Sequence, residues 1–341
     1  MGNKEIKRLW FSLVENDFNK LESLVNQAVE QKVDEIILLG ETEWMVYLKQ
    51  EHIDLLAQNN INVRILHGCG KNQYYINYYK QRNFDINNVV FWNTHWFNWS
   101  AVCLLGSKID YRIYEPDPTK FKHAFISLNN RRHIHRCIFI DELAKNNLLD
   151  RGVVTWTNFL NENPNYNFKH FHGNQMLLND DFITKLDSFL LPPEWHESLF
   201  HVVTEATHEA SFPSEKTTIP ILMKKPFIVF SCIHYHKMLT DLGFQLYDEV
   251  IDYSFDSEPD IEFRAEKFMK NVVKIAELDK VETYNLLRPK IIHNYNRAIE
   301  IIKSKEFIPN IVKERVEEIK LTGHTLLVDS RFEMFMNDCN D

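Results

Sequence analysis

The chain lacks several features that would assign it to a particular class of protein. Its five cysteines include no Cys-x-x-Cys pair, which argues against a disulfide framework and against a zinc knuckle. No apolar run approaches the roughly 18 residues of a membrane span, and the first residues lack the apolar core of a signal peptide. We therefore expect a cytoplasmic protein whose thiols are reduced.

Positive charge is also in short supply. The 341 residues carry 39 lysines and arginines against 48 aspartates and glutamates, a net charge of −9. This balance provides no general attraction to nucleic acid, so binding to a polyanion would need a local basic region. No stretch is rich enough in proline, glycine or serine to predict a disordered linker. We expect a chain that is folded nearly throughout, in two domains of ordinary size.

The first third of the chain alternates between two hydrophobic patterns. Apolar residues at helical spacing predict helices, and short apolar runs between them predict strands. The helices are expected at 18–31, 44–59 and 74–82, and the strands at 35–40, 62–67 and 88–93. Alternation of this kind is typical of βαβ units with a mainly parallel sheet.

The same alternation restarts after the proline-bearing stretch 115–119. Strands are expected at 123–128, 153–156, 201–204 and 226–231, and helices at 135–146, from Ser214 onward, and at 262–278, 280–304 and 307–320. The sequence thus predicts an α/β protein with two Rossmann-like domains, mainly parallel sheets and a helical C-terminal tail. We place one domain at 1–120, a second at 121–305 and the tail at 306–341.

Polar segments that directly follow predicted strands are the first places to look for a site, because parallel sheets bind ligands at the carboxyl ends of their strands. In residues 125–136 a strand leads through a polar turn to the start of a helix. Amide groups at a helix N-terminus attract anions, and Arg136 can add a bidentate phosphate contact. Taken alone, the segment could equally be a basic, solvated loop.

A second polar segment, residues 204–217, ends in Phe-Pro-Ser-Glu-Lys-Thr. Ser214 can cap a helix whose first turn carries Glu215, where negative charge suits the helix dipole. Capping does not explain Lys216, a cation placed against the same dipole. An acid and a base side by side suit a nucleotide diphosphate, with the carboxylate on the ribose hydroxyls and the ammonium on the phosphates.

The order of these segments resembles the donor-binding half of inverting glycosyltransferases of the GT-B type. It is similar to the α-1,3-fucosyltransferase and exostosin-like groups and to glycosyltransferase-like proteins of large DNA phages. In those fucosyltransferases an aromatic-x-x-Glu-Lys motif holds the nucleotide, and Phe212, Glu215 and Lys216 match it, with phenylalanine in place of the usual tyrosine. The resemblance covers about residues 120–300, including the segments 225–231 and 251–256. It implies that the domain at 121–305 binds the nucleotide-sugar donor and that the domain at 1–120 is on the acceptor side.

The resemblance implies transfer of a sugar from a nucleotide-diphosphate donor to a hydroxyl acceptor, with inversion and without a metal or a further cofactor. Fixed positive groups would stabilise the leaving diphosphate. The acceptor would be a glycan or, on the phage branch, a hydroxymethylated DNA base. The implied donor-binding residues are Ser127, Asn129, Asn130, Arg136, Phe212, Ser214, Glu215, Lys216 and Thr217.

The general base that deprotonates the acceptor is sought after strands of the N-terminal domain. The candidates are Glu41, Glu43, His67 and His95. Each has a structural alternative, since the glutamates could cap the next helix and the histidines could be buried.

Two other functions stay open. Histidines recur as His-x-His at 133/135, 170/172 and 234/236, which would suit a metal-dependent enzyme. A non-catalytic nucleotide-sensing protein could also keep the donor site without the base. The chain contains no Asp-x-Asp motif, which argues against the metal-dependent GT-A class of glycosyltransferases.

Overall fold

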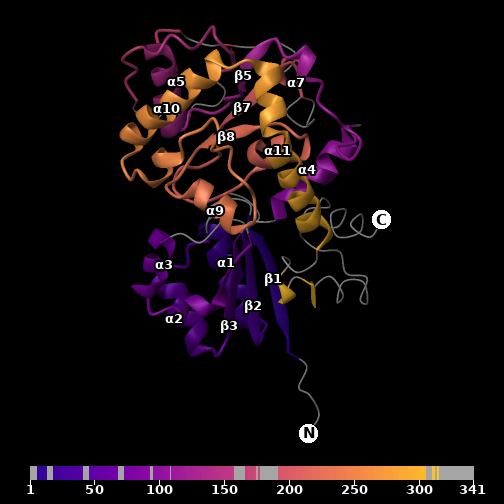
Figure 1. Cartoon of the computed structure of the whole chain (residues 1–341). Helices are drawn as coiled ribbons and strands as arrows, with labels where there is room; N and C mark the ends of the chain where they lie inside the picture. The colour runs from indigo at the N-terminus through magenta and orange to yellow at the C-terminus, as the bar shows by residue number, and fades with distance from the viewer. Residues whose placement is uncertain are drawn as a thin grey trace. The chain divides into compact units, whose positions relative to one another are not determined.

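A computed structural model gives the fold. It describes residues 6–13, 18–40, 46–67, 73–92, 95–107, 109–156, 166–173, 176, 191–304, 309–311 and 313–314. The chain forms two compact units, one of residues 1–95 with 304–341 and one of residues 96–303, each of which is visible in Figure 1. The domain limits predicted at 120 and 305 stay a prediction.

The first unit contains a parallel sheet in the order β1-β2-β3-β4. Its strands are β1 (Arg8–Leu13), β2 (Glu35–Gly40), β3 (Asn62–His67) and β4 (Val89–Phe91). They are linked by α1 (Phe18–Glu30), α2 (Gln50–Gln58), α3 (Gln73–Lys80) and a 3-10 turn, η1 (Ile86–Asn88). Ile36, Leu38 and Ile65 are completely buried in its core. The chain passes from strand to neighbouring strand without reversing direction across the sheet.

The helix predicted at 44–59 is wrong in its first part, because α2 begins only at Gln50. Two tyrosines of α3 hold the preceding segment in another conformation. The hydroxyl of Tyr79 donates to the carbonyl of Val46 at 2.7 Å and accepts from the amide of Leu48 at 3.1 Å. The hydroxyl of Tyr75 donates to the same Val46 carbonyl. These tertiary hydrogen bonds replace the helical ones that the local sequence favours.

The second unit contains a parallel sheet in the order β6-β5-β7-β8. Its strands are β5 (His123–Ser127), β6 (Val153–Val154), β7 (Ser198–Thr204) and β8 (Phe227–Phe230). The chain runs from β5 outward to β6 and then returns past β5 to β7. The direction across the sheet therefore reverses between β5 and β7, and such a topological switch point leaves a crevice at the carboxyl ends of the two strands.

Helices cover both faces of this second sheet. α5 (Ile134–Lys145) leads from β5 to β6 and packs with α10 (Ile261–Glu277). α8 (Glu215–Leu222) leads the opposite way, from β7 to β8, and packs with α11 (Lys280–Lys303). Right-handed crossovers in opposite directions place α5 and α8 on opposite faces, and Figure 1 shows α10 and α11 on the two sides of the strands.

Five further elements of the second unit are described. They are α4 (His95–Gly106), η2 (Pro118–Lys120), α7 (Pro193–His196), α9 (Tyr235–Asp241) and η3 (Tyr253–Ser257). The two parallel sheets with their helices confirm the predicted α/β class. α10 and α11 match the predictions at 262–278 and 280–304, whereas most of the predicted tail lies outside the described residues. No helix in the described part of the chain is both long and apolar enough to span a membrane.

Candidate anion-binding site

The carboxyl ends of β5 and β7 are joined by Asn129, which is fully buried. Its amide N–H donates to the Thr155 hydroxyl just after β6 at 2.8 Å. Its side-chain oxygen accepts from the Thr204 hydroxyl at the end of β7 at 2.5 Å, and its side-chain nitrogen donates to the Ser127 hydroxyl at 3.1 Å. Ser127 and Asn129 therefore shape the turn that follows β5, while Asn130 is half-buried beside them.

The first turn of α5 reaches across the switch point to the end of β7. The guanidinium of Arg136 donates to the carbonyl of Glu205 at 2.8 Å and to that of Thr204 at 3.4 Å. His135 Nε2 lies 2.8 Å from the same Glu205 carbonyl. Arg136 is almost fully buried, so its positive charge is fixed at the carboxyl edge of the sheet.

Glu205 is a site residue that the sequence analysis missed. Its carboxylate accepts hydrogen bonds from the amides of Ala206 and Ser214 and from three hydroxyls. The hydroxyls are those of Ser214 at 2.5 Å, Thr217 at 2.5 Å and Tyr235 at 3.0 Å. With five donors and no solvent exposure, the carboxylate fixes the start of α8 relative to the end of β7. The available signal in the sequence was an acid placed directly after a mostly apolar strand.

The Glu215-Lys216 pair stands at the start of α8, as expected. Ser214 caps this helix by accepting from the Lys216 amide at 3.2 Å. The Lys216 ammonium pairs with the Glu215 carboxylate, and each side chain is 27% exposed. Burial acts to raise the pKa of Glu215, but the charge and hydrogen bond of Lys216, with a contribution from Arg136, outweigh it and lower that pKa. Glu215 is therefore ionised at neutral pH.

Two residues of the predicted donor set are buried in packing positions. The ring of Phe212 meets Trp96 of α4 edge-on, with 5.1 Å between centroids. The Thr217 hydroxyl binds Glu205 and lies 2.8 Å from the Tyr235 hydroxyl. The nine predicted residues thus lie between the end of β5 and the first turn of α5 or around the start of α8, and Glu215 and Lys216 are more exposed than Ser214 and Thr217.

A group of histidines lies at the same edge. His133 precedes α5 as its N-cap residue, and His208 belongs to the loop between β7 and α8. Burial and the charges of Arg136, Arg131 and Lys216 lower the pKa of His133 to about 4. Burial likewise lowers the pKa of His208. Both rings are uncharged at neutral pH although they stand beside cations.

The His-x-His pairs do not assemble into a metal site within the described residues, where no group of three or more His, Cys, Asp or Glu side chains could hold an ion. His236 is used structurally. Its Nδ1 is 2.9 Å from an Asp256 oxygen, and its Nε2 accepts from the Val229 amide at 3.3 Å. His234 is exposed and has a left-handed backbone with φ of 62°.

Of the four candidate bases, only the side chain of His67 falls among the described residues. It ends β3, where the ring of Tyr75 lies edge-on at 4.3 Å and that of Phe91 is stacked at 5.8 Å. Burial lowers the pKa of His67 to about 3. Neither ring nitrogen has a hydrogen-bond partner among the described residues. Glu41, Glu43 and the side chain of His95 lie outside the described part, so the base stays a prediction.

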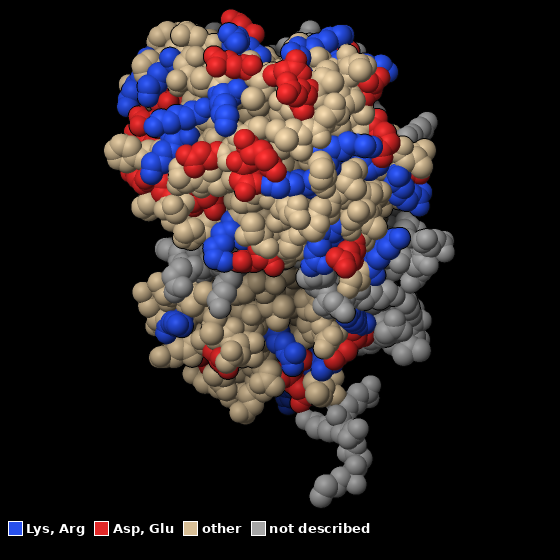
Figure 2. All heavy atoms as spheres, in the orientation of Figure 1, with Lys and Arg blue, Asp and Glu red and all other residues tan. Residues whose placement is uncertain are grey.

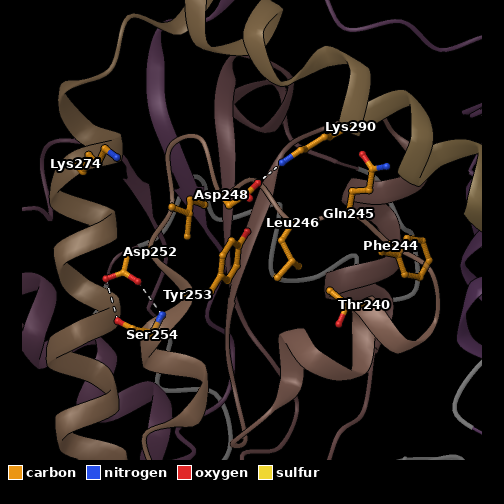
Figure 3. Close-up of a pocket in the computed structure, with 11 residues that line it drawn as sticks. Thr240, Phe244, Gln245, Leu246, Asp248, Asp252, Tyr253, Ser254, Lys274 and Lys290 are labelled. Carbon is orange, nitrogen blue, oxygen red and sulfur yellow. Dashed lines mark hydrogen bonds and ion pairs between the residues drawn. The ribbon is translucent and has the colours of Figure 1, made fainter.

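The second unit also has an open pocket of about 940 Å³ bordered by α9, residues 244–254, α10 and α11. Figure 3 shows Lys274 and Lys290 facing it from two different helices. Lys290 pairs with Asp248 and with Glu249, and Asp252 caps η3 through the Ser254 amide at 2.9 Å. None of its lining residues belongs to the segments that follow β5 and β7, and two of its charged residues, Lys290 and Asp248, are paired with each other.

No protein-family model matches the chain, and no curated protein is significantly similar to it in sequence. Among solved structures, similarity is found to the DNA modifying enzyme β-glucosyltransferase, determined with and without its substrate uridine diphosphoglucose. The TM-score is 0.33 and the identity 10%, over 86% of this chain and 98% of that chain. At this identity the similarity does not extend to individual side chains.

Proposed function

We propose that the chain is a glycosyltransferase that moves a sugar from a nucleotide-diphosphate donor to a hydroxyl acceptor, with inversion and without a metal. One observation carries the proposal: the two polar segments that match the donor-binding motif both lie at the carboxyl ends of the strands that flank the switch point. Ligands of open parallel sheets bind at this place. If the two segments were only a solvated basic loop and a helix cap, their shared position at the switch point would not be expected.

The electrostatics of the site suit a diphosphate. Lys216 and the start of α5 supply groups that attract an anion, and Arg136 adds a buried positive charge beside them. When the bond between the anomeric carbon and the phosphate oxygen breaks, negative charge grows on that oxygen. Fixed positive groups stabilise this charge. The reaction therefore needs neither a metal nor a general acid that protonates the leaving phosphate oxygen.

The remaining residues are given positioning roles. Glu215, held ionised by Lys216 and Arg136, would accept hydrogen bonds from the ribose hydroxyls. Ser127, Asn129, Asn130, Phe212, Ser214 and Thr217 would shape the crevice that receives the nucleotide. Deprotonation of the acceptor is assigned to the group Glu41, Glu43, His67 and His95. The nucleotide sugar is the sole co-substrate in this proposal.

The acceptor is proposed to be a glycan or a hydroxymethylated DNA base. Figure 2 shows basic and acidic side chains interspersed over the visible face of the second unit, with no continuous region of one sign among the described residues. Binding of duplex DNA usually requires a basic surface, because neutralised phosphates supply most of the affinity. On the face shown, a glycan is therefore the better match.

Binding and turnover of nucleotide sugars test the proposal. We expect one nucleoside diphosphate from a panel containing UDP, GDP, ADP and dTDP to raise the melting temperature. The corresponding nucleotide sugar should be consumed when a suitable acceptor is present. Lys216→Ala should abolish the shift, because it removes the ammonium that faces the phosphates.

Lys237→Ala is the matched control, since Lys237 also pairs with a nearby carboxylate, that of Asp241, but on α9. Binding without turnover on any acceptor would favour the nucleotide-sensing function. If no nucleoside diphosphate shifts the melting temperature, the donor site itself is refuted.

A further inference from the structure

The open pocket beside α9, α10 and α11 is a cavity that the proposed function does not use. Its volume of about 940 Å³ is at the upper end of the range of about 300 to 1,000 Å³ that is usual for small-molecule sites. The end of α9, residues 244–254, α10 and α11 all contribute to its walls, and all belong to the second unit (Figure 3). The pocket therefore has room for a ligand larger than a single ring.

The charged side chains of the pocket balance one another. Lys274 and Lys290 line it together with Asp248 and Asp252, two basic residues against two acidic ones. The hydrogen bond from Lys290 lowers the pKa of Asp248, and those from the amide and hydroxyl of Ser254 lower the pKa of Asp252. Both carboxylates are therefore ionised at neutral pH. An anionic ligand would meet two carboxylates and a cationic ligand would meet two ammonium groups, so the lining favours neither.

Several hydrogen-bond donors of the pocket have no partner in the described part of the chain. The Lys274 ammonium and the side-chain amide of Gln245 are both exposed, and neither makes an ion pair or a hydrogen bond there. The Tyr253 hydroxyl accepts from the Tyr247 amide at 3.1 Å, but no described residue accepts its own proton. These donors are available to a ligand.

Acceptors line the same pocket. A carboxylate has about four lone-pair sites, and the carboxylate of Asp252 uses two of them for the amide and hydroxyl of Ser254, each at 2.9 Å. Asp248 likewise has accepting capacity beyond its pair with Lys290. The Thr240 hydroxyl donates to a carbonyl of its own helix at 2.7 Å and keeps its oxygen as an acceptor. A ligand hydroxyl can donate and accept at once, so hydroxyl groups match this wall better than purely accepting or purely donating groups.

Apolar side chains form the rest of the wall. Phe244 and Ile251 are almost completely buried, and Leu246 is half-buried. Figure 3 shows Leu246 and the Tyr253 ring facing the pocket between its charged groups. Apolar walls with a small number of placed polar groups are usual in small-molecule sites. A sugar ring suits such a wall, because it has C–H groups on its faces and hydroxyls around its edge.

We propose that this pocket is a second ligand-binding site of the chain and that it binds a neutral oligosaccharide. The ligand bears many hydroxyls because the wall offers donors and acceptors together, and it is uncharged because the basic and acidic side chains cancel. Several sugar units fit the volume. The inference goes beyond the proposed function and uses no residue of the donor site, so either can fail without the other.

Calorimetry with tetrasaccharides tests the inference on the full chain. The neutral probes are maltotetraose, cellotetraose and tetra-N-acetylchitotetraose, and the charged probe of the same length is tetragalacturonate. We expect at least one neutral probe to bind with a sub-millimolar dissociation constant. Tetragalacturonate should bind at least about tenfold more weakly even at low salt, where its repulsion by the two carboxylates is least screened.

Two variants place the bound oligosaccharide in the pocket. Gln245→Ala and Lys274→Ala each remove an exposed donor without a described partner, so each should weaken binding by about two- to tenfold, as for the loss of one hydrogen bond. Asn296→Ala and Lys270→Ala are the matched controls, because both side chains are exposed on α11 and α10 but do not line the pocket. The controls should bind like the native protein.

Three results would overturn the inference. They are absence of binding by all three neutral probes, tighter binding of tetragalacturonate than of any neutral probe, and an affinity that Gln245→Ala and Lys274→Ala leave unchanged. Lys216→Ala separates the inference from the proposed function, since it should lose nucleotide binding and keep oligosaccharide binding. Loss of oligosaccharide binding in Lys216→Ala would assign the sugar to the donor site and would also overturn the inference.

Discussion

The two sheets have the same size and the same parallel pairing, yet their strands end in different environments. His67 ends β3 of the first unit and Glu205 directly follows β7 of the second, and both are fully buried. His67 is enclosed by aromatic rings and is neutral, whereas Glu205 receives five hydrogen bonds. The carboxyl end of a strand in a parallel sheet can thus hold an uncharged polar group or an organised hydrogen-bond network, depending on the donors that the following segment supplies.

Strand order adds a second difference. The first sheet runs β1-β2-β3-β4 without reversal, whereas the second reverses between β5 and β7. At such a reversal, the segments that follow two neighbouring strands lead to opposite faces of the sheet, and a crevice is expected between them. The Glu205 network and the histidine group both lie at that reversal. The position of the site therefore depends on the strand order together with the local hydrogen-bond donors.

The largest effect is expected from Glu205→Ala. The substitution leaves two amides and three hydroxyls without their acceptor, and each buried unsatisfied group costs about 1 to 3 kcal/mol before relaxation. We expect the free energy of unfolding of the second unit to fall by about 4 kcal/mol, measured by urea denaturation. Glu209→Gln, in the same loop but exposed, should change it by less than about 0.5 kcal/mol. Similar losses for the two variants would show that the network does not hold the loop.

Lys225 tests the opposite, amino-terminal end of β7. Its ammonium donates to the Ser198 carbonyl and lies 4.5 Å from the Trp195 ring, and burial lowers its pKa to about 7. Because the unfolded chain retains the proton up to about pH 10, it binds more protons than the folded state above pH 7, so stability rises with pH. We expect a gain of about 2 kcal/mol between pH 7 and pH 9.

Lys225→Met should remove this gain and raise the stability at pH 7, since it removes a buried charge that has no ion pair in the described part of the chain. Urea denaturation of both proteins at several pH values between 7 and 9 measures the two slopes. Parallel slopes would mean that Lys225 stays charged and is stabilised by the aromatic ring.

His67 makes the corresponding prediction for the first unit at acidic pH. Its pKa is lowered to about 3 in the folded state, whereas the unfolded value is near 6.5. The contribution of the neutral His67 ring to the free energy of unfolding is therefore fully present above pH 6.5. It is lost as the pH falls toward 3. The loss should reach about 2 kcal/mol between pH 7 and pH 5.

His67→Phe should abolish this contribution, because phenylalanine fits among the aromatic rings and does not titrate. Hydrogen exchange of the β3 amides measures the effect in the first unit, and the β7 amides serve as the internal reference. An unchanged acid dependence at β3 in the variant would show that another group governs it.

The smallest effect on stability is expected from Lys216→Ala. The Lys216 and Glu215 side chains are each partly exposed, and such pairs contribute about 0 to 1 kcal/mol. Loss of a cation near a helix N-terminus is favourable to the helix and offsets part of that. We expect a change below about 0.5 kcal/mol in urea denaturation, although nucleotide binding should be lost. A large destabilisation would assign Lys216 to the structure of the loop.

Much of the fold could be predicted from local patterns. The predicted helix at 280–304 and the strand at 62–67 match α11 and β3 closely, because their apolar spacing agrees with their burial. β1 and α4 were not predicted. The composition of α4 is apolar almost throughout, and it shows no helical periodicity because side chains on several of its faces are packed in the second unit.

The candidate site was predicted only in part. The motif around Glu215 and Lys216 was visible because the two charges are adjacent in the sequence. Glu205 and His208 were missed, since their partners lie many residues away, as in the contact between Tyr235 and Glu205. Arg136 was singled out as a phosphate ligand, but its contacts with the Thr204 and Glu205 carbonyls could not be foreseen.

The sequence by itself determined the α/β class, most helices and strands, and the presence of an acid and a base at one helix start. These features depend on periodicity and on neighbouring residues, which the chain carries locally. Only the tertiary structure decided that the two polar segments meet, because strand order is set by the packing of crossover helices. It also decided the charge state of His133 and His67, since burial and distant charges control their pKa values.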